Sequence, residues 1–419
     1  MAEQPHGPNA NGRPASAYLS GRPAADPRLD SSRPSADLRL DQLKYGRERR
    51  TEGQPDTEAL PAPGSAADPS AGGAAQRWAW LEDLLPPVER VRPGLWSIPV
   101  PWPGSALRYT LAYVMSCPGG VALVDTGWPT DHAWSSLADG IRQTGHDITD
   151  VRYVLVTHAH ADHLGMAGRV RELSDARVGM HPAEAATLSE VSAPASRQRY
   201  ADWLRSRGVP RGQLGEILGP SAAAAESRVS LAMPDVDIEH GSRPLGAGTA
   251  LRAVWTPGHT PGHLCFYDEQ QDVLLTGDHV LPRITPHIGL PPGADGDPLG
   301  GYLASLQGLS RYRPTEVLPA HEYRFADLGA RIGALLRHHR IRLAEIEHAV
   351  ASNPGISTWD VAQALTWSRG WEQTRGMARH SAISETWAHL VHLRTRSRVL
   401  DNGRDPDAWL PGPRCSAAD

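Results

Sequence analysis

The pattern of hydrophobic and polar positions divides the chain into three parts. Residues 1–77 are rich in Pro, Ala, Gly, Ser and Asp and show no lasting periodicity. Such a segment offers too little apolar surface to offset its chain entropy. We therefore expect residues 1–77 to form a disordered tail, with ordered structure beginning near Trp78.

Short apolar runs alternate with amphipathic stretches from residue 78 to residue 330, which indicates one layered α/β domain. The strands expected from the apolar runs are Leu107–Met115, Val121–Val124, Val151–Val156, Arg177–Met180, Leu251–Trp255, Leu264–Tyr267, Val273–Leu275 and Glu316–Leu318. The helices expected from the amphipathic stretches are Asp131–Arg142, Gly165–Leu173 and Tyr302–Tyr312. The Ala- and Arg-rich segment 182–234 predicts an inserted helical segment, either a wall of a substrate cleft or a plain surface elaboration.

The last part, residues 331–415, is expected to be mainly helical. The predicted helices are Ala330–Val350, a helix that follows the N-cap Ser357-Thr358, and His380–Arg394. Two short apolar segments around Asp401-Asn402-Gly403 predict a small hairpin. The histidines of this part, His338, His339, His380, His389 and His392, are interpreted as structural or surface residues.

Composition narrows the classes of protein. The formal net charge of −5 gives no global electrostatic reason to expect a nucleic-acid partner. Cys117, Cys265 and Cys415 are far apart and form no CxxC pair, so a reducing cytoplasm is the expected setting. The sequence shows neither a signal peptide nor an apolar run of about 20 residues, so no membrane association is expected. Composition leaves the oligomeric state open.

The strongest chemical signal is a cluster of metal-binding residue types directly after the apolar run Val151–Val156. His158, His160, Asp162 and His163 place three imidazoles and a carboxylate within six residues. A loop that leaves the end of a strand can direct all four side chains into one pocket. Imidazole and carboxylate are ligands that Zn²⁺ and related divalent ions accept. A single histidine is usually structural, but this spacing predicts a metal site.

The cluster and four further motifs resemble the metallo-β-lactamase superfamily over residues 90–325. The motifs are the HxHxDH cluster, Asp125-Thr126-Gly127, the TPGHTPGH segment 256–263, Gly277-Asp278 and Pro319-Ala320-His321. The resemblance implies a four-layer αββα fold and two divalent metal ions, Zn²⁺ by default, with Fe or Mn able to accept the same ligands. It implies that His158, His160 and His259 hold one metal, that Asp162, His163 and His321 hold the other, and that Asp278 bridges both.

The resemblance also implies how such a site works. A hydroxide that bridges the two metals attacks the substrate, and Asp162 orients it as the catalytic residue. Asp125 is expected to fix a ligand imidazole or its loop, and His263 to support its own loop. His279 and Arg283 flank Asp278 and are expected either to face the substrate or to pack around the site.

Several substrates remain open for a hydrolase of this type. His321-Glu322-Tyr323 is similar to the end of the glyoxalase II core, where the tyrosine helps to hold a thioester substrate. A small-molecule thioester is therefore the expected substrate, and a lactone is an alternative. β-Lactam hydrolysis is disfavoured, because the broad-spectrum zinc β-lactamases carry a cysteine near the position of Asp278.

The C-terminal part supports a different alternative. Residues 331–400 hold ten arginines against five acidic residues, and this part resembles the winged-helix-like tail of lactamase-beta-like proteins, some of which cut single-stranded RNA. Nucleic acid is therefore an alternative partner through this region. A non-enzymatic metal-binding protein would predict an interrupted ligand set, whereas all seven positions are filled.

Overall fold

The computed structural model describes residues 73–191, 196–219, 232–290 and 292–413 of the chain, all within one compact unit, Arg49–Asp419. The expected tail lies outside the described residues up to position 72. Its expected boundary is too late, because helix α1 (Ala74–Leu81) begins before residue 78. Gln76 of this helix is buried, donates a hydrogen bond to Ser97 Oγ at 2.9 Å and accepts one from the backbone N–H of Arg324 at 3.0 Å.

The first sheet has seven strands whose spatial order follows the chain. They are β1 (Glu89–Arg92), β2 (Leu95–Pro101), β3 (Tyr109–Cys117), β4 (Gly120–Val124), β5 (Val151–Leu155), β6 (Arg177–Met180) and β7 (Val236–Asp237). The pairs from β1 to β4 are antiparallel, and the pairs from β4 to β7 are parallel. Strands β3 to β6 confirm the expected ones, whereas β1, β2 and β7 were not expected.

The second sheet has the strand order β11-β10-β9-β8. The strands are β8 (Leu251–Trp255), β9 (Leu264–Asp268), β10 (Val273–Gly277) and β11 (Glu316–Pro319). Strand β10 is parallel to β11 and antiparallel to β9, and β9 is antiparallel to β8. Strands β8, β10 and β11 therefore run in the same direction, and their carboxyl ends lie at one edge.

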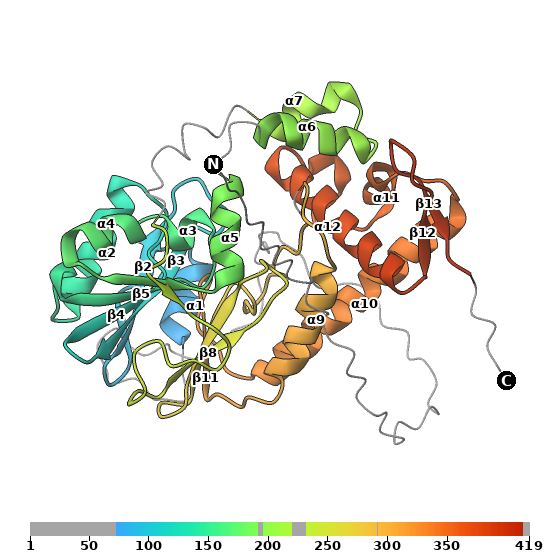
Figure 1. Ribbon diagram of the computed structural model, residues 1–419. Helices are drawn as coiled ribbons and strands as arrows, with labels where there is room; N and C mark the ends of the chain where they lie inside the picture. The colour runs from blue at the N-terminus through green and yellow to red at the C-terminus, as the bar shows by residue number, and fades with distance from the viewer. Residues whose placement is uncertain (1–72, 192–195, 220–231, 291, 414–419) are drawn as a thin grey trace, which may run out of the picture. The chain divides into compact units, whose positions relative to one another are not determined.

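Helices cover the outer face of each sheet (Figure 1). The first sheet carries α2 (Asp131–Gln143), the 3₁₀ turn Ile148–Asp150, α3 (Ala161–Leu164), α4 (Ala167–Ser174) and α5 (Pro182–Val191), and the second carries α9 (Pro298–Leu309) and α10 (Leu328–Ser352). Helix α9 begins before the expected Tyr302, because the Asp297 side chain caps it by accepting from the backbone N–H of Gly300 and Pro298 fills its first position.

Alternation along β3 shows how the four layers are built. Leu111 and Tyr113 point to the apolar core between the two sheets, whereas Ala112 and Val114 point to the core under α2 and α4. A further core lies between the second sheet and helices α9 and α10. Three cores between four layers confirm the expected αββα fold.

The C-terminal region is helical, as expected. It consists of α10, α11 (Thr358–Ala364), the 3₁₀ turn Trp371–Gln373 and α12 (Met377–Thr395), followed by the hairpin β12 (Val399–Asp401) and β13 (Trp409–Pro411). Ser357 caps α11 as predicted, since its Oγ accepts from the backbone N–H of Asp360 at 3.2 Å. The likeness to a winged helix stays a prediction.

Part of the inserted segment packs on the C-terminal region. The described part of the insertion holds α5, α6 (Ser196–Ser206) and α7 (Arg211–Leu218). Trp203 of α6 and Ile217 of α7 share one apolar cluster with Trp387 of α12 and Trp409 of β13. Leu188 of α5 instead belongs to the core of the first sheet. The insertion therefore joins two parts of the molecule.

Candidate metal centre

The loops that carry the predicted ligands leave strands at one edge of the two sheets. His158 follows β5, His259 follows β8, Asp278 follows β10 and His321 follows β11. These strand ends lie together because β8, β10 and β11 run in the same direction, so residues far apart in the sequence meet in space.

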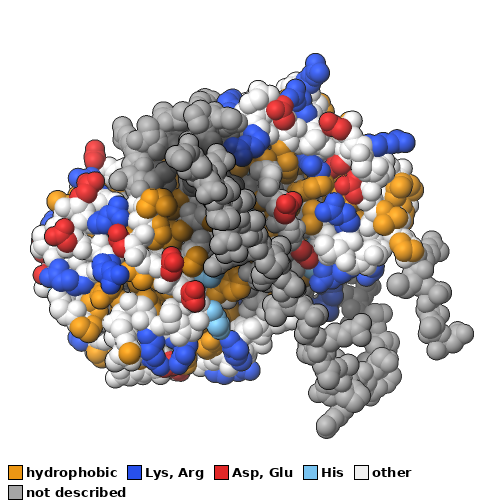
Figure 2. Space-filling view, viewed as in Figure 1, with side chains coloured by type: hydrophobic (Ala, Val, Ile, Leu, Met, Phe, Trp, Pro, Cys, Tyr) orange, Lys and Arg blue, Asp and Glu red, His pale blue; other side chains and the backbone are white. Residues whose placement is uncertain are grey.

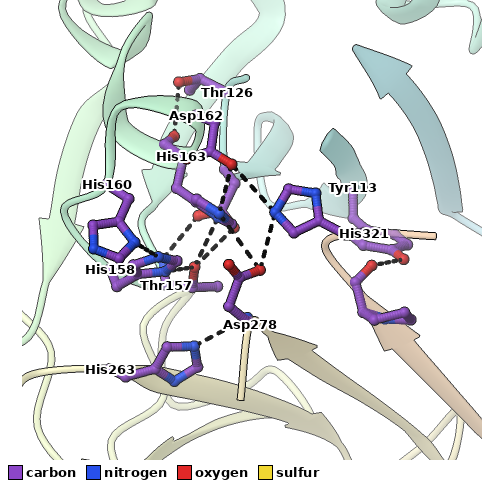
Figure 3. A network of polar contacts seen from close by, with 12 residues as sticks. Tyr113, Thr126, Thr157, His158, His160, Asp162, His163, His263, Asp278 and His321 are labelled. Atoms are coloured by element: carbon purple, nitrogen blue, oxygen red, sulfur yellow. Dashed lines mark hydrogen bonds and ion pairs between the residues drawn. The ribbon is translucent and has the colours of Figure 1, made fainter. Parts of the chain in front are cut away.

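All seven predicted ligands come together in two groups. Figure 3 labels each of these ligands except His259. The first group is His158, His160, His259 and Asp278, and the second is Asp162, His163 and His321. Within each group the ligand atoms lie within 4.8 Å of one another. We refer to them below as the first and second ligand groups.

Two of the three nitrogen–nitrogen distances in the first ligand group are close to those of a tetrahedral cation site. His160 Nδ1 lies 2.8 Å from His158 Nε2, and His259 Nε2 lies 3.2 Å from His160 Nδ1 and 3.3 Å from His158 Nε2. Nitrogens bound to Zn²⁺ at their usual bond length are about 3.3–3.4 Å apart in a tetrahedron. Burial lowers the pKa of His158 well below its usual value and that of His160 to about 3, which favours the neutral imidazoles that ligate metals.

Buried polar atoms of the second ligand group and of the neighbouring Asp278 have no hydrogen-bond partner among the described residues. These atoms include His163 Nε2, His321 Nε2 and Asp278 Oδ1. His321 Nε2 lies 3.2 Å from both Asp162 Oδ2 and Asp278 Oδ1. Buried polar groups without partners cost free energy, and a cation between these atoms would satisfy all of them. The residues therefore fit a divalent metal.

Asp278 lies between the two groups. Its Oδ1 is 3.6 Å from His163 Nε2 in the second group, and its Oδ2 is 3.7 Å from His259 Nε2 in the first. Burial would raise the pKa of the Asp278 carboxyl, but His321 and His163 hold it well below its usual range. The carboxylate is therefore ionised and presents one oxygen to each group.

Backbone geometry at Gly277 brings Asp278 into this position. Gly277 has φ = 49°, and a Cβ there would lie 2.8 Å from His263 Nε2, so glycine is required. His263 is buried outside both groups; its Nε2 accepts from the backbone N–H of Asp278 at 3.2 Å, and its Nδ1 lies 2.9 Å from Thr256 Oγ1. His263 thus supports the loops that carry the ligands.

Asp125 holds a ligand imidazole. Its Oδ2 lies 2.7 Å from His163 Nδ1, and the same carboxylate accepts from the backbone N–H and from the Oγ1 of Thr157, each at 2.8 Å. This contact orients His163 so that its Nε2 faces the second ligand group.

The remaining predicted residues lie around the site rather than in it. His279 is fully buried with its ring centroid 4.7 Å from that of Tyr302, so it packs behind Asp278. Arg283 is exposed, and its backbone N–H donates to Glu322 Oε2. Tyr323 is half-buried, packs against the core between the sheets and hydrogen-bonds to the Arg77 side chain.

Sequence reasoning missed three features of the site. Trp102 and Trp128 stack with ring centroids 4.7 Å apart, and the Trp102 ring centroid is 6.4 Å from that of His321. The backbone carbonyl of His287 lies 2.7 Å from His259 Nδ1 and fixes that ring. Glu184 contacts two ligand loops. No motif marks these residues; only the tryptophans near ligand loops offered a signal.

A four-layer αββα fold with histidine and aspartate clusters at its strand ends defines a class of metal-dependent hydrolases. The family model of the metallo-beta-lactamase superfamily matches residues 106–321, just over half of the chain. The chain therefore belongs to the metallo-beta-lactamase superfamily, whose members are in general hydrolytic metalloenzymes.

Individual relatives agree with this assignment. The chain is 27% identical to the lactamase-like protein vrtG of Penicillium aethiopicum over 64% of this chain and 69% of that protein. It is 25% identical to the probable metallo-hydrolase YqjP of Bacillus subtilis over 58% of this chain and 77% of that protein. For several other relatives, the chain spans less than two thirds of their length.

A solved structure shows the same fold over most of the chain. A metallo-beta-lactamase family protein from Thermus thermophilus is 30% identical, with a TM-score of 0.65. The match covers 77% of this chain and 100% of that one, so the likeness extends beyond residues 106–321.

Proposed function

We propose that this protein hydrolyses an ester-type bond in a small molecule, preferably a thioester, with two divalent ions, Zn²⁺ by default, held by the two ligand groups. The observation that carries the proposal is Asp278, which turns one oxygen toward each group. When bound, two such ions would supply an activated water and polarise the substrate carbonyl.

The protein's own residues have defined tasks in this proposal. Asp162 is the catalytic residue: its carboxylate is buried, and its pKa lies well below the usual range because His163 and His321 outweigh the effect of burial. An ionised carboxylate accepts a hydrogen bond from the attacking water and orients it. Asp278 keeps the two groups at a fixed separation, and Asp125 keeps His163 in place.

Two observations support a thioester with an apolar acyl group. His263 and His279, which flank the ligand groups, are fully buried and cannot donate a proton to a leaving group. A thiolate leaves without such a donor more readily than an alkoxide does, because a thiol has a much lower pKa than an alcohol. The half-buried Trp102–Trp128 stack beside His321 offers an aromatic surface to the acyl chain.

RNA is the weaker alternative because five of the ten arginines at positions 331–400 pair with acidic side chains. Arg342, Arg379, Arg394, Arg396 and Arg398 form ion pairs with acidic side chains. On the face shown in Figure 2, basic and acidic side chains of the described residues are interspersed. Phosphate binding favours a basic surface of one sign. A lactonase differs only in its leaving group and remains the second candidate.

A substrate panel on protein of measured metal content tests the proposal. The panel contains aryl and alkyl acyl thioesters, matched oxygen esters, lactones and single-stranded RNA. We expect two metal equivalents per chain, the highest kcat/KM for thioesters, and loss of turnover after chelation with recovery on adding Zn²⁺. Cleavage of RNA alone, or full turnover without metal, would contradict the proposal.

A cytoplasmic setting belongs to the same proposal. Among the described residues, Cys117 and Cys265 are free thiols, which a reducing compartment preserves. No helix in the described part of the chain combines the length and the apolar character needed to cross a membrane.

A further inference from the structure

Glu184, in the first turn of α5, is a buried carboxylate beside the first ligand group. Only 1% of the residue is exposed. Burying a carboxylate costs free energy unless strong hydrogen bonds compensate it. The contacts that compensate Glu184 therefore indicate what this residue does.

Both oxygens of Glu184 accept hydrogen bonds from ligand loops. Oε1 accepts from the backbone N–H of Ala159 at 2.7 Å, and Oε2 accepts from the backbone N–H of Gly262 at 2.8 Å. Ala159 lies between His158 and His160, and Gly262 lies in the loop that follows His259. One side chain thus joins the two loops that supply all three histidines of the first ligand group.

The close approach of α5 to the second of these loops is built into the sequence. A Cβ at position 262 would lie 2.3 Å from the backbone nitrogen of Glu184 and 2.5 Å from its Cβ. Only glycine permits this distance. The loop is therefore pressed against α5 at the point where Glu184 accepts its hydrogen bond.

We infer that Glu184 is a positioning residue that sets the spacing and metal affinity of the first ligand group, separately from the second. Asp125 does the corresponding work for the second group through His163. The two carboxylates come from different elements, α5 and the loop after β4. Both contact the loop after β5, but Asp125 contacts Thr157 and the His163 imidazole, whereas Glu184 contacts Ala159 and joins it to Gly262 in the loop of His259. The inference rests on the proposed metal centre.

The test is Glu184→Gln in the full-length protein. Glutamine keeps the size of the side chain, but its NH₂ group cannot accept from a backbone N–H, so one of the two hydrogen bonds is lost. Replacing a hydrogen-bond partner of this kind typically weakens metal binding by about 10- to 100-fold. We expect one Zn²⁺ equivalent to bind about 10- to 100-fold more weakly in a chelator competition, with the other unchanged.

A second measurement shows which of the two metal sites has lost affinity. A general loss of protein stability would not weaken one site selectively. X-ray absorption of Co²⁺-loaded protein counts the imidazoles on the ion that remains after partial chelation. Glu184→Gln should retain an ion with two imidazoles, from His163 and His321, whereas Asp125→Asn should retain one with three. Glu172→Gln, which changes an exposed carboxylate on α4, should match the wild type.

Each result decides the inference. Equal affinity of both ions in Glu184→Gln, or equal weakening of both, would overturn it while leaving the proposed metal centre intact. A wild-type protein that binds no metal would overturn both. If Glu184→Gln folds less stably, the melting temperatures of metal-free and metal-loaded protein separate the effects, because the inference requires the larger loss in the loaded form.

Discussion

At the residue scale, the ligand histidines are held by hydrogen bonds on the side away from the metal position. His259 Nδ1 lies 2.7 Å from the carbonyl of His287, and His321 Nδ1 lies 3.0 Å from the carbonyl of Tyr109. Each contact fixes the ring orientation and leaves the other nitrogen for a cation. These two backbone carbonyls therefore hold both imidazoles in an orientation suited to ligation.

Removing the carboxylate between the two groups should abolish hydrolysis. Asp278→Ala takes away the anion that would be shared by two cations, so they repel and one leaves. We expect a drop from two metal equivalents to one or fewer and a loss of at least about 100-fold in kcat/KM, with the far-ultraviolet circular dichroism unchanged. Metal analysis and steady-state kinetics measure the two effects.

The control for this variant is Asp268→Ala. Asp268 also ends a strand and is buried, but its carboxylate accepts from the backbone N–H groups of Gln270 and Gln271. We expect this variant to lose about 0.5–2 kcal/mol of stability and to keep both metals. If Asp278→Ala behaves in the same way while His160→Ala loses metal, Asp278 only closes a turn and the bridging role is wrong.

Residue chemistry explains which site residues the sequence reveals. The seven ligands occur in short sequence motifs because several ligand side chains must come from the same loop or from the residue after the same strand. Glu184 accepts hydrogen bonds from backbone N–H groups, which every residue except proline provides. Its partners therefore need no particular side chain, and no sequence motif identifies them. Gln76 is similar: its partners, Ser97 and Arg324, are distant in the chain.

At the element scale, two loops carry the aromatic pair beside the second ligand group. Trp102 follows β2 and Trp128 follows β4, and Trp102 approaches His321. We expect Trp102→Ala to raise KM for aryl-acyl thioesters by about 2- to 10-fold relative to acetyl thioesters, with kcat little changed. Kinetics with a paired substrate series measure this ratio.

Trp96→Ala is the matched control for the aromatic pair. Trp96 is a half-buried tryptophan of β2, but its ring contacts His146 rather than Trp128. This variant should leave the aryl-to-acetyl ratio unchanged. An equal change of KM for both substrates in Trp102→Ala would show that the pair does not select the acyl group.

The contact between α9 and α12 should make stability depend on pH. Burial would raise the pKa of Asp297, but hydrogen bonds from His392 and from the backbone N–H of Gly300 lower it, and Arg396 adds to this effect. The pKa of Asp297 is lower in the folded protein than in the unfolded chain. The ionised Asp297 carboxylate therefore stabilises the folded protein fully above about pH 4, and this stabilisation is lost as the pH falls through the folded pKa of Asp297. Asp297→Asn should therefore flatten the acid side of the stability curve.

Urea unfolding of metal-free protein at several pH values between about 2.5 and 7 measures this effect without interference from metal loss. Asp131→Asn, which changes an exposed acid at the start of α2, should retain the wild-type slope. Parallel curves for wild type and Asp297→Asn would contradict the prediction.

Element boundaries were predictable where a local signal marks them. Ser357 before α11 and the β-branched run of β5 are such signals, and both predictions were confirmed. Strand β2 contains Pro99 and Pro101, residues that disfavour a strand, yet it pairs with β3 along its whole length. The pairing of β2 with β3 and, at Leu95–Ser97, with β1 is a tertiary effect that the local sequence does not reveal.

At the scale of the whole molecule, the described residues form three apolar cores between the layers and one further apolar cluster that includes residues of the C-terminal region. The buried residues of the three cores between the layers extend no further than Leu335, whereas the cluster of α6, α7, α12 and β13 contains residues from Trp203 to Trp409. The order of layers followed from the alternation of strands and helices. The sequence did not predict that α6 and α7 pack against α12 and β13, because the apolar face of a helix does not identify the element that covers it.

A chain that begins at Gly73 should retain its fold and turnover. The composition of the preceding residues motivates this expectation. A chain that begins at Trp78 lacks Gln76 and its two buried hydrogen bonds, and we expect it to lose about 1–3 kcal/mol of stability. Thermal unfolding and kinetics of both chains check this. Loss of turnover in the folded longer chain would show that the preceding residues contribute to the site.

The cluster that joins α6 and α7 to the C-terminal hairpin has a consequence for protein synthesis. The last ligand, His321, leaves the ribosome before any residue of α12. Until Trp387 and Trp409 are translated, Trp203 and Ile217 have no apolar partners from that part of the chain. The nascent chain therefore holds a complete ligand set while α6 and α7 still lack these partners. A message truncated within α12 would release a protein prone to aggregation rather than an inactive but folded one.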